Sequence, residues 1–529
     1  SKGAGAMRQK FSVEVPTLEV TNQKASGRCW LFAATNVLRE RIAQIRNLEN
    51  FELSQSYLAF WDKFERCNYF LESILETADL PTNDRTVMHI LSTGVHDGGQ
   101  WDMFANIVRK YGVVPKDVYD ETYQSSNTRS MNAQLNRALK VAAAGLRRMV
   151  ADKAGADAIQ AEKNKTLDAI YGFLCSCHGE PPKAFDFEFV DKDQVYHIEK
   201  NLTPLTFAER YVGDLLDQIV SVINAPTADK PYHKTYTIRL LGNVVEGRPV
   251  VHLNLTMDEL KAAIIAQLKA GKVVWFGSDV GHFGERTLGV WDDRSFDFAA
   301  LTGLSLAMDK ADALDYGLAA MNHAMVLTGV NLDEAGKPTR WKIENSWGDK
   351  NGEKGYYVCS DSWFDQYVFQ AAVEREYLAA SPTSPQELVV LEPWIRWARW
   401  RIKRAPSNIK TDCPSASANF GNPFSLLCVR RFSRRVHPFE FNCPFRRCFR
   451  AVFVKCNRHF PRVLQFRQFF RSKSQFPSGF GRQAIHIYHN TIPFQSLSPI
   501  WLKSGESLLS AYRYFLFLFV LCTQQTGFH

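Results

Sequence analysis

The sequence predicts an α+β fold, because its hydrophobic pattern changes period along the chain. In residues 29–45 apolar side chains recur at helical spacing, which predicts a core helix that begins at or next to Cys29. Beyond about residue 272 the pattern becomes one of short apolar or alternating runs bounded by Gly, Asn and Asp, as in strands. Helices that come first and strands that come later are typical of an α+β protein.

Two longer stretches in the first half also predict helices. Ser54 to Leu71 is rich in aromatic residues, so we expect this helix to be packed on both sides. Residues 128–172 are rich in Ala, Leu, Lys and Arg with helical periodicity. They predict a helical insertion within the fold.

Two residue pairs have the spacing of a capping box, in which a Thr and a residue three positions later satisfy the first N–H groups of a helix. Thr206 with Glu209 predicts one helix start, and Thr256 with Glu259 predicts another. The second helix should end at Gly271, because glycine readily adopts the conformation that follows a helix. Strands are then expected at Val273–Phe276, Ala324–Val330, Trp341–Ile343 and Tyr356–Val358.

The charge of the chain is unevenly distributed. Its 529 residues carry a formal net charge of +9, and 45% apolar content allows a large core. From Trp394 onward, 22 Lys and Arg stand against 3 Asp and Glu, whereas the preceding part has 42 and 52. The same tail holds 19 of the 37 Phe and 6 of the 11 Cys. The chain therefore consists of an acidic body, residues 1–393, and a basic tail, residues 394–529, that differ in composition.

We hypothesise that a one-base frameshift at Trp394 produces this change in charge, Phe content and Cys content. The codons TGG ATA CGC TGG GCG CGC TGG CG encode Trp394 to Trp400 and begin Arg401. One G restored after the first TGG gives Trp-Asp-Thr-Leu-Gly-Ala-Leu-Ala instead. We therefore expect residues 394–529 to be an out-of-frame, basic and largely disordered tail, and sequencing of the locus tests this.

The alternative interpretation of the tail is a nucleic-acid-binding domain. Interleaved Arg and Phe suit phosphate contacts and base stacking, although no RNA-binding signature accompanies them. No CxxC pair is present among the tail cysteines near His459, or among Cys175, Cys177 and His178. Neither group therefore predicts a zinc site. The interleaved residues are Arg430, Arg431, Arg434, Arg435, Arg446, Arg447 and Arg450 with Phe432, Phe439, Phe445 and Phe449.

The body cysteines and the apolar segments indicate a soluble protein of a reducing compartment. The cysteines are odd in number and irregularly spaced, unlike a disulfide framework. Residues 1–7 do not resemble a secretory signal, and residues 514–522 are too short to span a bilayer. We therefore expect a cytoplasmic location and no membrane partner. The body cysteines are Cys29, Cys67, Cys175, Cys177 and Cys359.

The block TNQKASGRCWLF, residues 21–32, points to a nucleophile. A thiol attacks as a thiolate, and the N–H groups at a helix N-terminus lower its pKa. Cys29 is placed for this role, although a lone cysteine is more often buried and inert. Gln23 could point its amide at the same substrate carbonyl and form an oxyanion hole with the Cys29 N–H.

Two later motifs supply the partners that a nucleophilic cysteine requires. His323 stands at the entry to an apolar strand, and Asn345 stands at the end of another. A histidine base must be held in one tautomer by a third group, so we expect Asn345 to orient His323 and Trp347 to shield the pair from water. Cys, His and Asn in this order predict nucleophilic catalysis.

These residues resemble the papain family of cysteine peptidases. Ser26 to Trp30 matches the family's local signature, except that Ser26 replaces a disulfide cysteine of secreted members. Further motifs between about Val20 and Tyr377 resemble the bleomycin hydrolase (aminopeptidase C) branch of this family. They are FELSQSYLAFWDKFERCNYF from Phe51, HDGGQWDM from His96, VVWFGSDVG from Val273, HAM from His323 and ENSWGDKNGEKGYY from Glu344.

The resemblance implies a helical half that carries the cysteine, an antiparallel-sheet half that carries His and Asn, and a helical insertion. It implies hydrolysis of N-terminal residues of peptides through a thioester, and of bleomycin and homocysteine thiolactone, without metal or organic cofactor. Gly98 and Gly99 would hydrogen-bond an extended substrate. The resemblance also implies a homohexamer, in which the C-terminal segment of the chain lies in the catalytic cleft and enforces aminopeptidase action. In the family this segment is similar to WDPMGALA.

The expected organisation follows from these motifs. Because the C-terminal segment differs here, the alternatives are an inactive or endopeptidase-like variant, or a nucleic-acid-binding protein. The expected parts are an atypical N-terminal arm at 1–19, a helical half at 20–124, a mainly helical insertion at 125–255, a sheet half at 256–378, a linker at 379–393 and the tail at 394–529.

Overall fold

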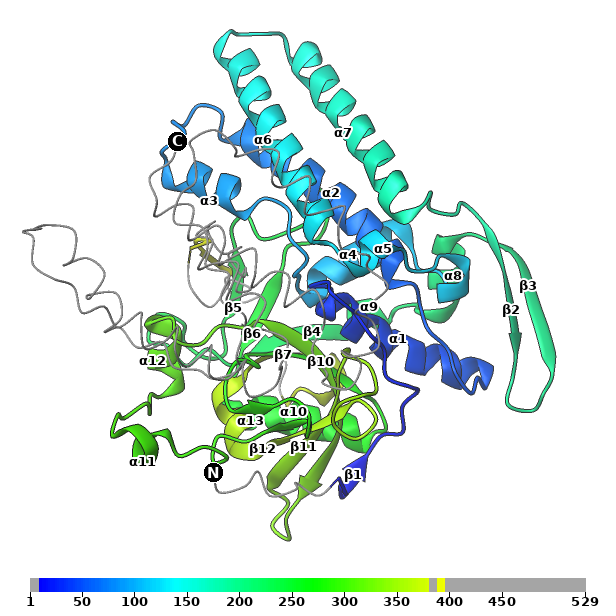
Figure 1. The fold of residues 1–529 in the computed structure, drawn as a ribbon, viewed down its shortest axis with the longest axis vertical. Helices are drawn as coiled ribbons and strands as arrows, with labels where there is room; N and C mark the ends of the chain where they lie inside the picture. Colours follow the sequence, from blue (N-terminus) through cyan, green and yellow to red (C-terminus); the bar gives the residue numbers. More distant parts are fainter. Residues whose placement is uncertain (1–8, 380–387, 395–529) are drawn as a thin grey trace, which may run out of the picture. The chain divides into compact units, whose positions relative to one another are not determined.

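The computed structural model describes residues 9–379 and 388–394. Helices and a large sheet together form the α+β architecture that the sequence predicts (Figure 1). None of the described helices is long and apolar enough to cross a membrane. The helices are α1 Cys29–Arg46, α2 Gln55–Glu76, α3 Arg85–Thr93, α4 Trp101–Tyr111, α5 Tyr123–Ser126, α6 Arg129–Ala151, α7 Ala156–His178, α8 Pro204–Tyr211, α9 Leu215–Gln218, α10 Met257–Lys269, α11 Phe298–Thr302, α12 Lys310–Asp315 and α13 Asp361–Tyr367.

The main sheet has twelve strands in the order β14-β5-β6-β4-β13-β7-β10-β11-β12-β9-β8, with β1 paired to β10. Most pairs are antiparallel, as expected, but β4 with β6, β5 with β14 and β9 with β12 are parallel. A separate hairpin pairs β2 with β3. The strands are β1 Val13–Glu14, β2 Phe185–Val190, β3 Tyr196–Leu202, β4 Ile219–Ile223, β5 Thr235–Ile238, β6 Val251–Asn254, β7 Val274–Ser278, β8 Gly284–Glu285, β9 Val290–Trp291, β10 His323–Leu332, β11 Pro338–Glu344, β12 Tyr356–Ser360, β13 Val368–Glu374 and β14 Leu388–Leu391.

Helix α1 begins at Cys29, as the periodicity predicts, and packs against β10. Its apolar side chains are buried almost throughout, including Leu31, Leu38 and Ile42. The helix ends at Asn47, which adopts the left-handed conformation that terminates helices. Cys29, the first residue of the helix, and Ala324, the second residue of the strand, are therefore parts of one core.

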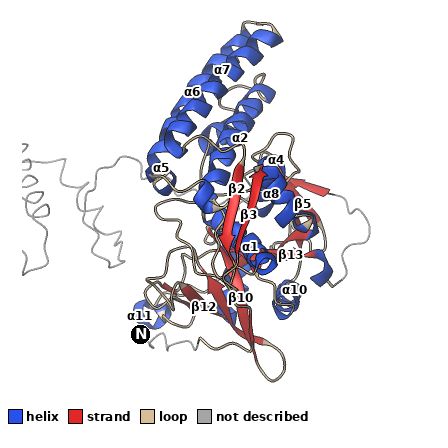
Figure 2. Ribbon diagram, turned by 90° about the vertical axis from the view of Figure 1, so that its right-hand side faces the viewer, coloured by secondary structure: helices blue, strands red, loops and turns tan. Residues whose placement is uncertain are grey.

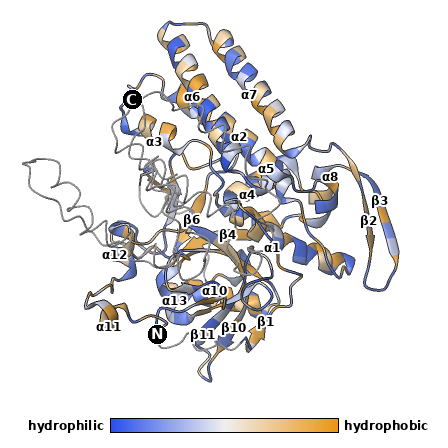
Figure 3. Cartoon of the chain, viewed as in Figure 1, coloured by the Kyte–Doolittle hydropathy of each residue, from blue (hydrophilic) through white to orange (hydrophobic). Residues whose placement is uncertain are grey.

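The insertion is built on α6 and α7, which lie side by side and pack with α2 (Figure 2). Residues Met131, Leu135 and Leu139 of α6 are buried at helical spacing, and polar and apolar residues alternate along both helices (Figure 3). Amphipathic helices of this kind bury one face only. They enclose a second hydrophobic core that is separate from the core around the sheet.

Residues 185–254 contain strands that the sequence analysis did not predict. The expected mainly helical insertion at 125–255 is helical up to His178, but its later part supplies β2 to β6, three of which join the main sheet. The expected linker at 379–393 likewise contains β14, whose apolar run pairs with β5. Short strands of this kind are fixed by distant partners, which local periodicity does not show.

The predicted helix start at Thr206 is wrong by three residues. Helix α8 begins at Pro204, and Thr203 is its N-cap. Thr206 is instead the third residue of the helix and returns the capping interaction to Thr203. Proline at the first helical position favours this earlier start. The box of Thr256 with Glu259 is confirmed, and it opens α10.

A buried ion pair connects α1 to β11. The Arg39 guanidinium donates to Glu344 Oε1 at 2.8 Å, and the two side chains are only 2% and 1% exposed. Asn36 donates to the same oxygen. Burial raises the pKa of Glu344 to about 7, against the opposing effect of Arg39. The interaction ties the helix that begins at Cys29 to the strand that ends before Asn345.

We expect Arg39→Met to lower the free energy of unfolding by about 3 kcal/mol, because it leaves a buried carboxyl without its cation. Urea denaturation measures this change. The exposed pair Lys165 and Glu162 is the control, and Lys165→Met should change stability by less than about 0.5 kcal/mol. Equal effects of the two substitutions would show that the buried pair has no special role.

Candidate active site

Cys29 is the first residue of α1, and its side chain is 3% exposed. Burial raises the pKa of its thiol to about 12. Hydrogen bonds from the backbone of Ala324 and Trp30 act in the opposite direction, and the negative charge of Asp97 adds to the increase. The contact with Ala324 places the sulfur beside the residue that follows His323.

Loss of water outweighs the backbone N–H groups at the start of α1, which act to lower the pKa of Cys29. A lone thiol in this position stays protonated at neutral pH. Formation of a thiolate therefore requires a nearby base that takes the proton.

His323 and Asn345 are in direct contact. His323 is the first residue of β10, and Asn345 directly follows β11, its antiparallel neighbour. His323 Nε2 lies 2.8 Å from Asn345 Oδ1, and both side chains are buried. The Ser346 N–H donates to the same Oδ1 at 2.8 Å, which identifies this atom as the oxygen. His323 Nε2 must then carry the hydrogen, so Nδ1 is the nitrogen that can accept a proton.

Trp347 covers the imidazole. Its indole ring stacks on His323 with ring centroids 4.8 Å apart and an angle of 27° between the planes. Arg286 lies over the Trp347 ring at 4.9 Å from its centroid. The stacked ring limits access of water to the His323–Asn345 hydrogen bond, which strengthens an electrostatic interaction.

Gln23 is held beside this pair by residues from both halves of the fold. Its Oε1 accepts from the Ser346 hydroxyl at 2.7 Å, and its Nε2 donates to the Ser26 carbonyl at 2.6 Å. The Gln23 N–H donates to the Ser346 carbonyl at 2.9 Å. The orientation of the amide is thus defined, with Nε2 on the side of the loop that leads to Cys29.

The loop that contains Gly98 and Gly99 packs against the start of α1. The Gly98 carbonyl accepts from Arg66 Nη2 at 2.7 Å. A Cβ atom on Gly99 would lie 2.7 Å from the Trp30 ring, so only glycine allows this close packing. Gly99 is therefore explained by its contact with the residue after Cys29.

Asp97 is a connecting residue that the sequence analysis missed. Its carboxylate accepts from the Gly27 N–H at 2.9 Å and from Lys63 Nζ at 2.7 Å. Thr128 and Asn132, at the start of the insertion, donate to the same carboxylate at 2.6 and 2.7 Å. The loop before Cys29 is thereby fixed to α2 and α6. An acidic residue directly before two glycines was the available signal.

Ser346 and Arg28 were missed as well. The Ser346 side chain holds Gln23, and its place between Asn345 and Trp347 was the only signal in the sequence. Arg28 is 1% exposed and forms two hydrogen bonds, of 2.9 and 2.8 Å, with Glu121. The Arg28 charge lowers the pKa of Glu121, although burial acts to raise it. This ion pair fixes the N-cap of α1.

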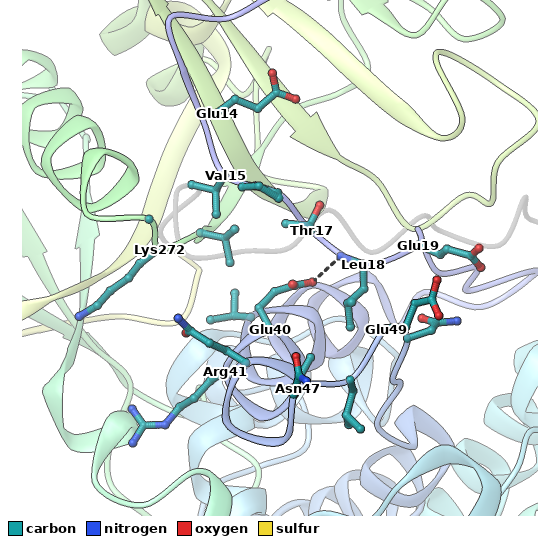
Figure 4. A pocket seen from close by; sticks show the side chains of 18 of the residues that line it. Glu14, Val15, Thr17, Leu18, Glu19, Glu40, Arg41, Asn47, Glu49 and Lys272 are labelled. Atoms are coloured by element: carbon teal, nitrogen blue, oxygen red, sulfur yellow. Dashed lines mark hydrogen bonds between the residues drawn. The ribbon is translucent and has the colours of Figure 1, made fainter. Parts of the chain in front are cut away.

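A cavity of about 990 Å³ lies elsewhere, between residues 14–19 and one face of α1 (Figure 4). Glu40, Arg41 and Lys272 contribute to its walls, and Glu40 accepts from the Leu18 N–H at 3.1 Å. Cys29, His323 and Asn345 are absent from the described residues that line it. No Cys, Ser or His is among the described residues that line this cavity, so it does not resemble a site for nucleophilic catalysis.

Some predictions concern metals and the tail. Within residues 9–379 and 388–394, no cluster of three or more His, Cys, Asp or Glu could hold a metal ion. The five body cysteines are all free thiols. The predicted basic and aromatic residues of the tail, Arg430 to Arg450, and Cys443, Cys448, Cys456 and His459, lie outside the described residues.

Comparisons with known proteins identify the family of the chain. The sequence profile of the Peptidase C1-like family matches residues 2–396. Aminopeptidase C of Streptococcus thermophilus is 50% identical over 386 residues, which are 73% of this chain and 87% of the relative. Aminopeptidase C of Listeria monocytogenes is 46% identical over the same shares of both chains.

A solved structure shows the same fold. The crystal structure of PepW from Lactobacillus rhamnosis HN001 is 51% identical in sequence, with a TM-score of 0.73. The match covers 74% of this chain and 89% of that one. The predicted papain-like α+β fold is confirmed. The chain belongs to the Peptidase C1-like family and is a cysteine-type peptidase.

Proposed function

We propose that this chain removes N-terminal residues from peptides, with Cys29 as nucleophile, His323 as base and Asn345 as the residue that orients the base. The observation that carries the proposal is the position of the Cys29 sulfur. It lies beside the backbone of Ala324, the residue that follows His323, and the Nε2 of His323 lies 2.8 Å from Asn345 Oδ1. The similarity to aminopeptidases C supports the aminopeptidase activity.

The reaction follows from the proton positions. His323 Nδ1 takes the thiol proton, and the Cys29 thiolate of this ion pair then bonds to the substrate carbonyl carbon. The carbonyl oxygen becomes an oxyanion, to which Gln23 Nε2 and the Cys29 N–H donate. His323 then returns the proton to the leaving amine, and the C–N bond breaks to leave a thioester. Water, deprotonated by His323, hydrolyses the thioester and restores the thiol.

Substrate recognition is assigned to the loop beside α1. We assign to Gly98 and Gly99 the hydrogen bonds that align an extended substrate chain. Because glycine has no side chain beyond a hydrogen atom, an extended substrate chain can approach the backbone of this loop closely. The contact of Gly99 with Trp30 keeps this loop beside the nucleophile.

Two further substrates belong to the same proposal. The amide of bleomycin and the thioester of homocysteine thiolactone would be cleaved by the same attack of Cys29 on a carbonyl carbon. Both compounds acylate the sulfur and need no metal or organic cofactor. A cytoplasmic location is also part of the proposal, and it is supported by five free thiols that a reducing compartment preserves.

Assembly into a homohexamer is the corresponding proposal for quaternary structure. The segment that includes α11 and α12 exposes an unusual number of apolar side chains, and large exposed apolar areas mark protein interfaces. A second copy of the chain would bury them. They are Leu288, Phe296, Phe298, Leu301, Leu304, Leu306, Met308, Tyr316 and Leu318.

The sequence match with the family ends at residue 396, close to the change of charge at Trp394. This position supports the proposal that the remaining tail, in which the family's ending is displaced, does not belong to the peptidase. The endopeptidase-like alternative applies if the displaced ending no longer fills the cleft, because control of the substrate's amino end would then be lost.

An aminoacyl fluorogenic amide with a free amine should be cleaved, and its N-blocked counterpart should not. Cys29→Ala should lower kcat by about 10³-fold or more, because no other nucleophile is in place. Fluorescence release measures both. Cleavage of the blocked substrate would indicate an endopeptidase-like variant, and cleavage of neither would mean an inactive one.

Alkylation of Cys29 by iodoacetamide should depend on His323. In the wild type the imidazole takes the proton, so alkylation should proceed near neutral pH. His323→Ala leaves a lone buried thiol with a raised pKa, and its alkylation should need a pH several units higher. Mass spectrometry of the Cys29 peptide measures the rate. Buried Cys67, whose pKa is also raised to about 12, should stay unlabelled near neutral pH in both proteins. Equal rates at pH 7 for the variant and the wild type would refute the pairing.

Gln23→Ala should lower kcat by about 10²-fold or more with little change in KM, because the amide acts on the oxyanion rather than on the bound substrate. Steady-state kinetics separate the two constants. The matched control is Gln160→Ala on the exposed part of α7, which should leave both unchanged. A change confined to KM would contradict the assignment.

A further inference from the structure

A buried carboxylate lies directly behind the turn that leads to His323. Asp279 follows β7, and its side chain is fully buried. The residue before it, Ser278, is the strand partner of His323. The Asn322 N–H donates to the Ser278 carbonyl at 3.0 Å. Asp279 and Asn322 are therefore neighbours across two adjacent strands.

The side chains of Asp279 and Asn322 form a closed set of hydrogen bonds. Asn322 Nδ2 donates to Asp279 Oδ1, and the Val280 N–H donates to Asn322 Oδ1 at 3.1 Å. Asp279 also accepts from the Gly281 N–H and the Ala320 N–H, both at 3.0 Å. Both carboxylate oxygens are thus occupied, and the turn before His323 is held from two sides.

The contacts favour an ionised carboxylate. Burial acts to raise the pKa of Asp279, but His282 and the backbone N–H groups lower it below its usual range. His282 Nε2 lies 3.4 Å from Asp279 Oδ2. The other titratable group that faces it is Tyr367 of α13, which stacks on His282 at 4.9 Å.

We propose that Asp279 is a positioning residue for His323 and acts through Asn322. The buried charge of Asp279 also favours the protonated imidazole. This role rests on the proposed function, in which a thiolate–imidazolium pair is the reactive form. Groups near His323 that titrate or carry charge include the Cys29 thiol, which lies beside Ala324, and Arg286, which lies over the Trp347 ring stacked on His323. The positive charge of Arg286 disfavours a protonated His323. The buried negative charge of Asp279, which follows β7, has the opposite effect.

The pH dependence of kcat/KM distinguishes an effect of the Asp279 charge from a purely structural role of this residue. The basic limb of kcat/KM against pH reports loss of the imidazolium proton. Asp279→Asn removes the anion and should move this limb to lower pH by about half a unit or more. A loss of packing alone would lower kcat/KM at every pH and leave the limb in place.

The experiment uses the full chain and the free-amine aminoacyl substrate. Activity of the wild type that Cys29→Ala abolishes establishes the proposed function first. Absence of that activity would count against the function, whereas activity with an unshifted limb in Asp279→Asn would overturn the Asp279 role alone. Asp168→Asn, which removes an exposed charge on α7, should leave the limb unchanged.

A second variant covers the possibility that Asp279→Asn does not fold. His282 is partly exposed and sits beside the carboxylate. His282→Lys places a permanent cation there and keeps Asp279 with its hydrogen bonds. The basic limb should again move to lower pH, by less than in Asp279→Asn. An unmoved limb in a folded His282→Lys protein would also overturn the role.

Discussion

The proposed chemistry depends on the pairing of residues 21–23 with residues 346–348, which joins the two halves of the fold. The Gln23 N–H donates to the Ser346 carbonyl, and the Gly348 N–H donates to the Thr21 carbonyl at 3.0 Å. The Ser346 hydroxyl completes the pairing by its bond to Gln23. The Gln23 amide, proposed to bind the oxyanion, and the Asn345 amide, proposed to orient His323, thus lie on or next to paired segments. Movement of one half would displace both.

Burial sets the electrostatic requirements of this arrangement. The space around Cys29 excludes water, which raises the pKa of the thiol far above neutral pH. The backbone N–H groups of α1 reduce this penalty only in part. A base next to the sulfur changes the balance, because the proton moves within the pair and the two charges form together. The same exclusion of water strengthens hydrogen bonds to a developing oxyanion. Burial raises the pKa of the Cys67 thiol to about 12 as well, so burial by itself favours the unreactive thiol form.

Local patterns in the sequence were sufficient for the features that depend on local interactions. The helix at Cys29, the capping box at Thr256 and the four predicted strands follow from spacing over a few residues. The strands in residues 185–254 did not follow, because their partners are far along the chain. Cys29, His323 and Asn345 could be named because each lies in a specific motif. Asp97 and Asp279 could not, because their importance arises only from contacts across the fold.

In these contacts a carboxylate stands beside each of the three proposed catalytic residues. The carboxylates of Asp279 and Glu344 are buried, and that of Asp97 is partly buried. Asp97 holds the loop before Cys29, Asp279 holds the turn before His323, and Glu344 precedes Asn345 and binds Arg39 of α1. A buried carboxylate is costly unless several donors satisfy it, so it defines one geometry and penalises others. Backbone N–H groups are among the donors to Asp97 and Asp279, so displacement of either loop breaks these bonds. Stability and the alignment of the reacting groups therefore depend on the same interactions.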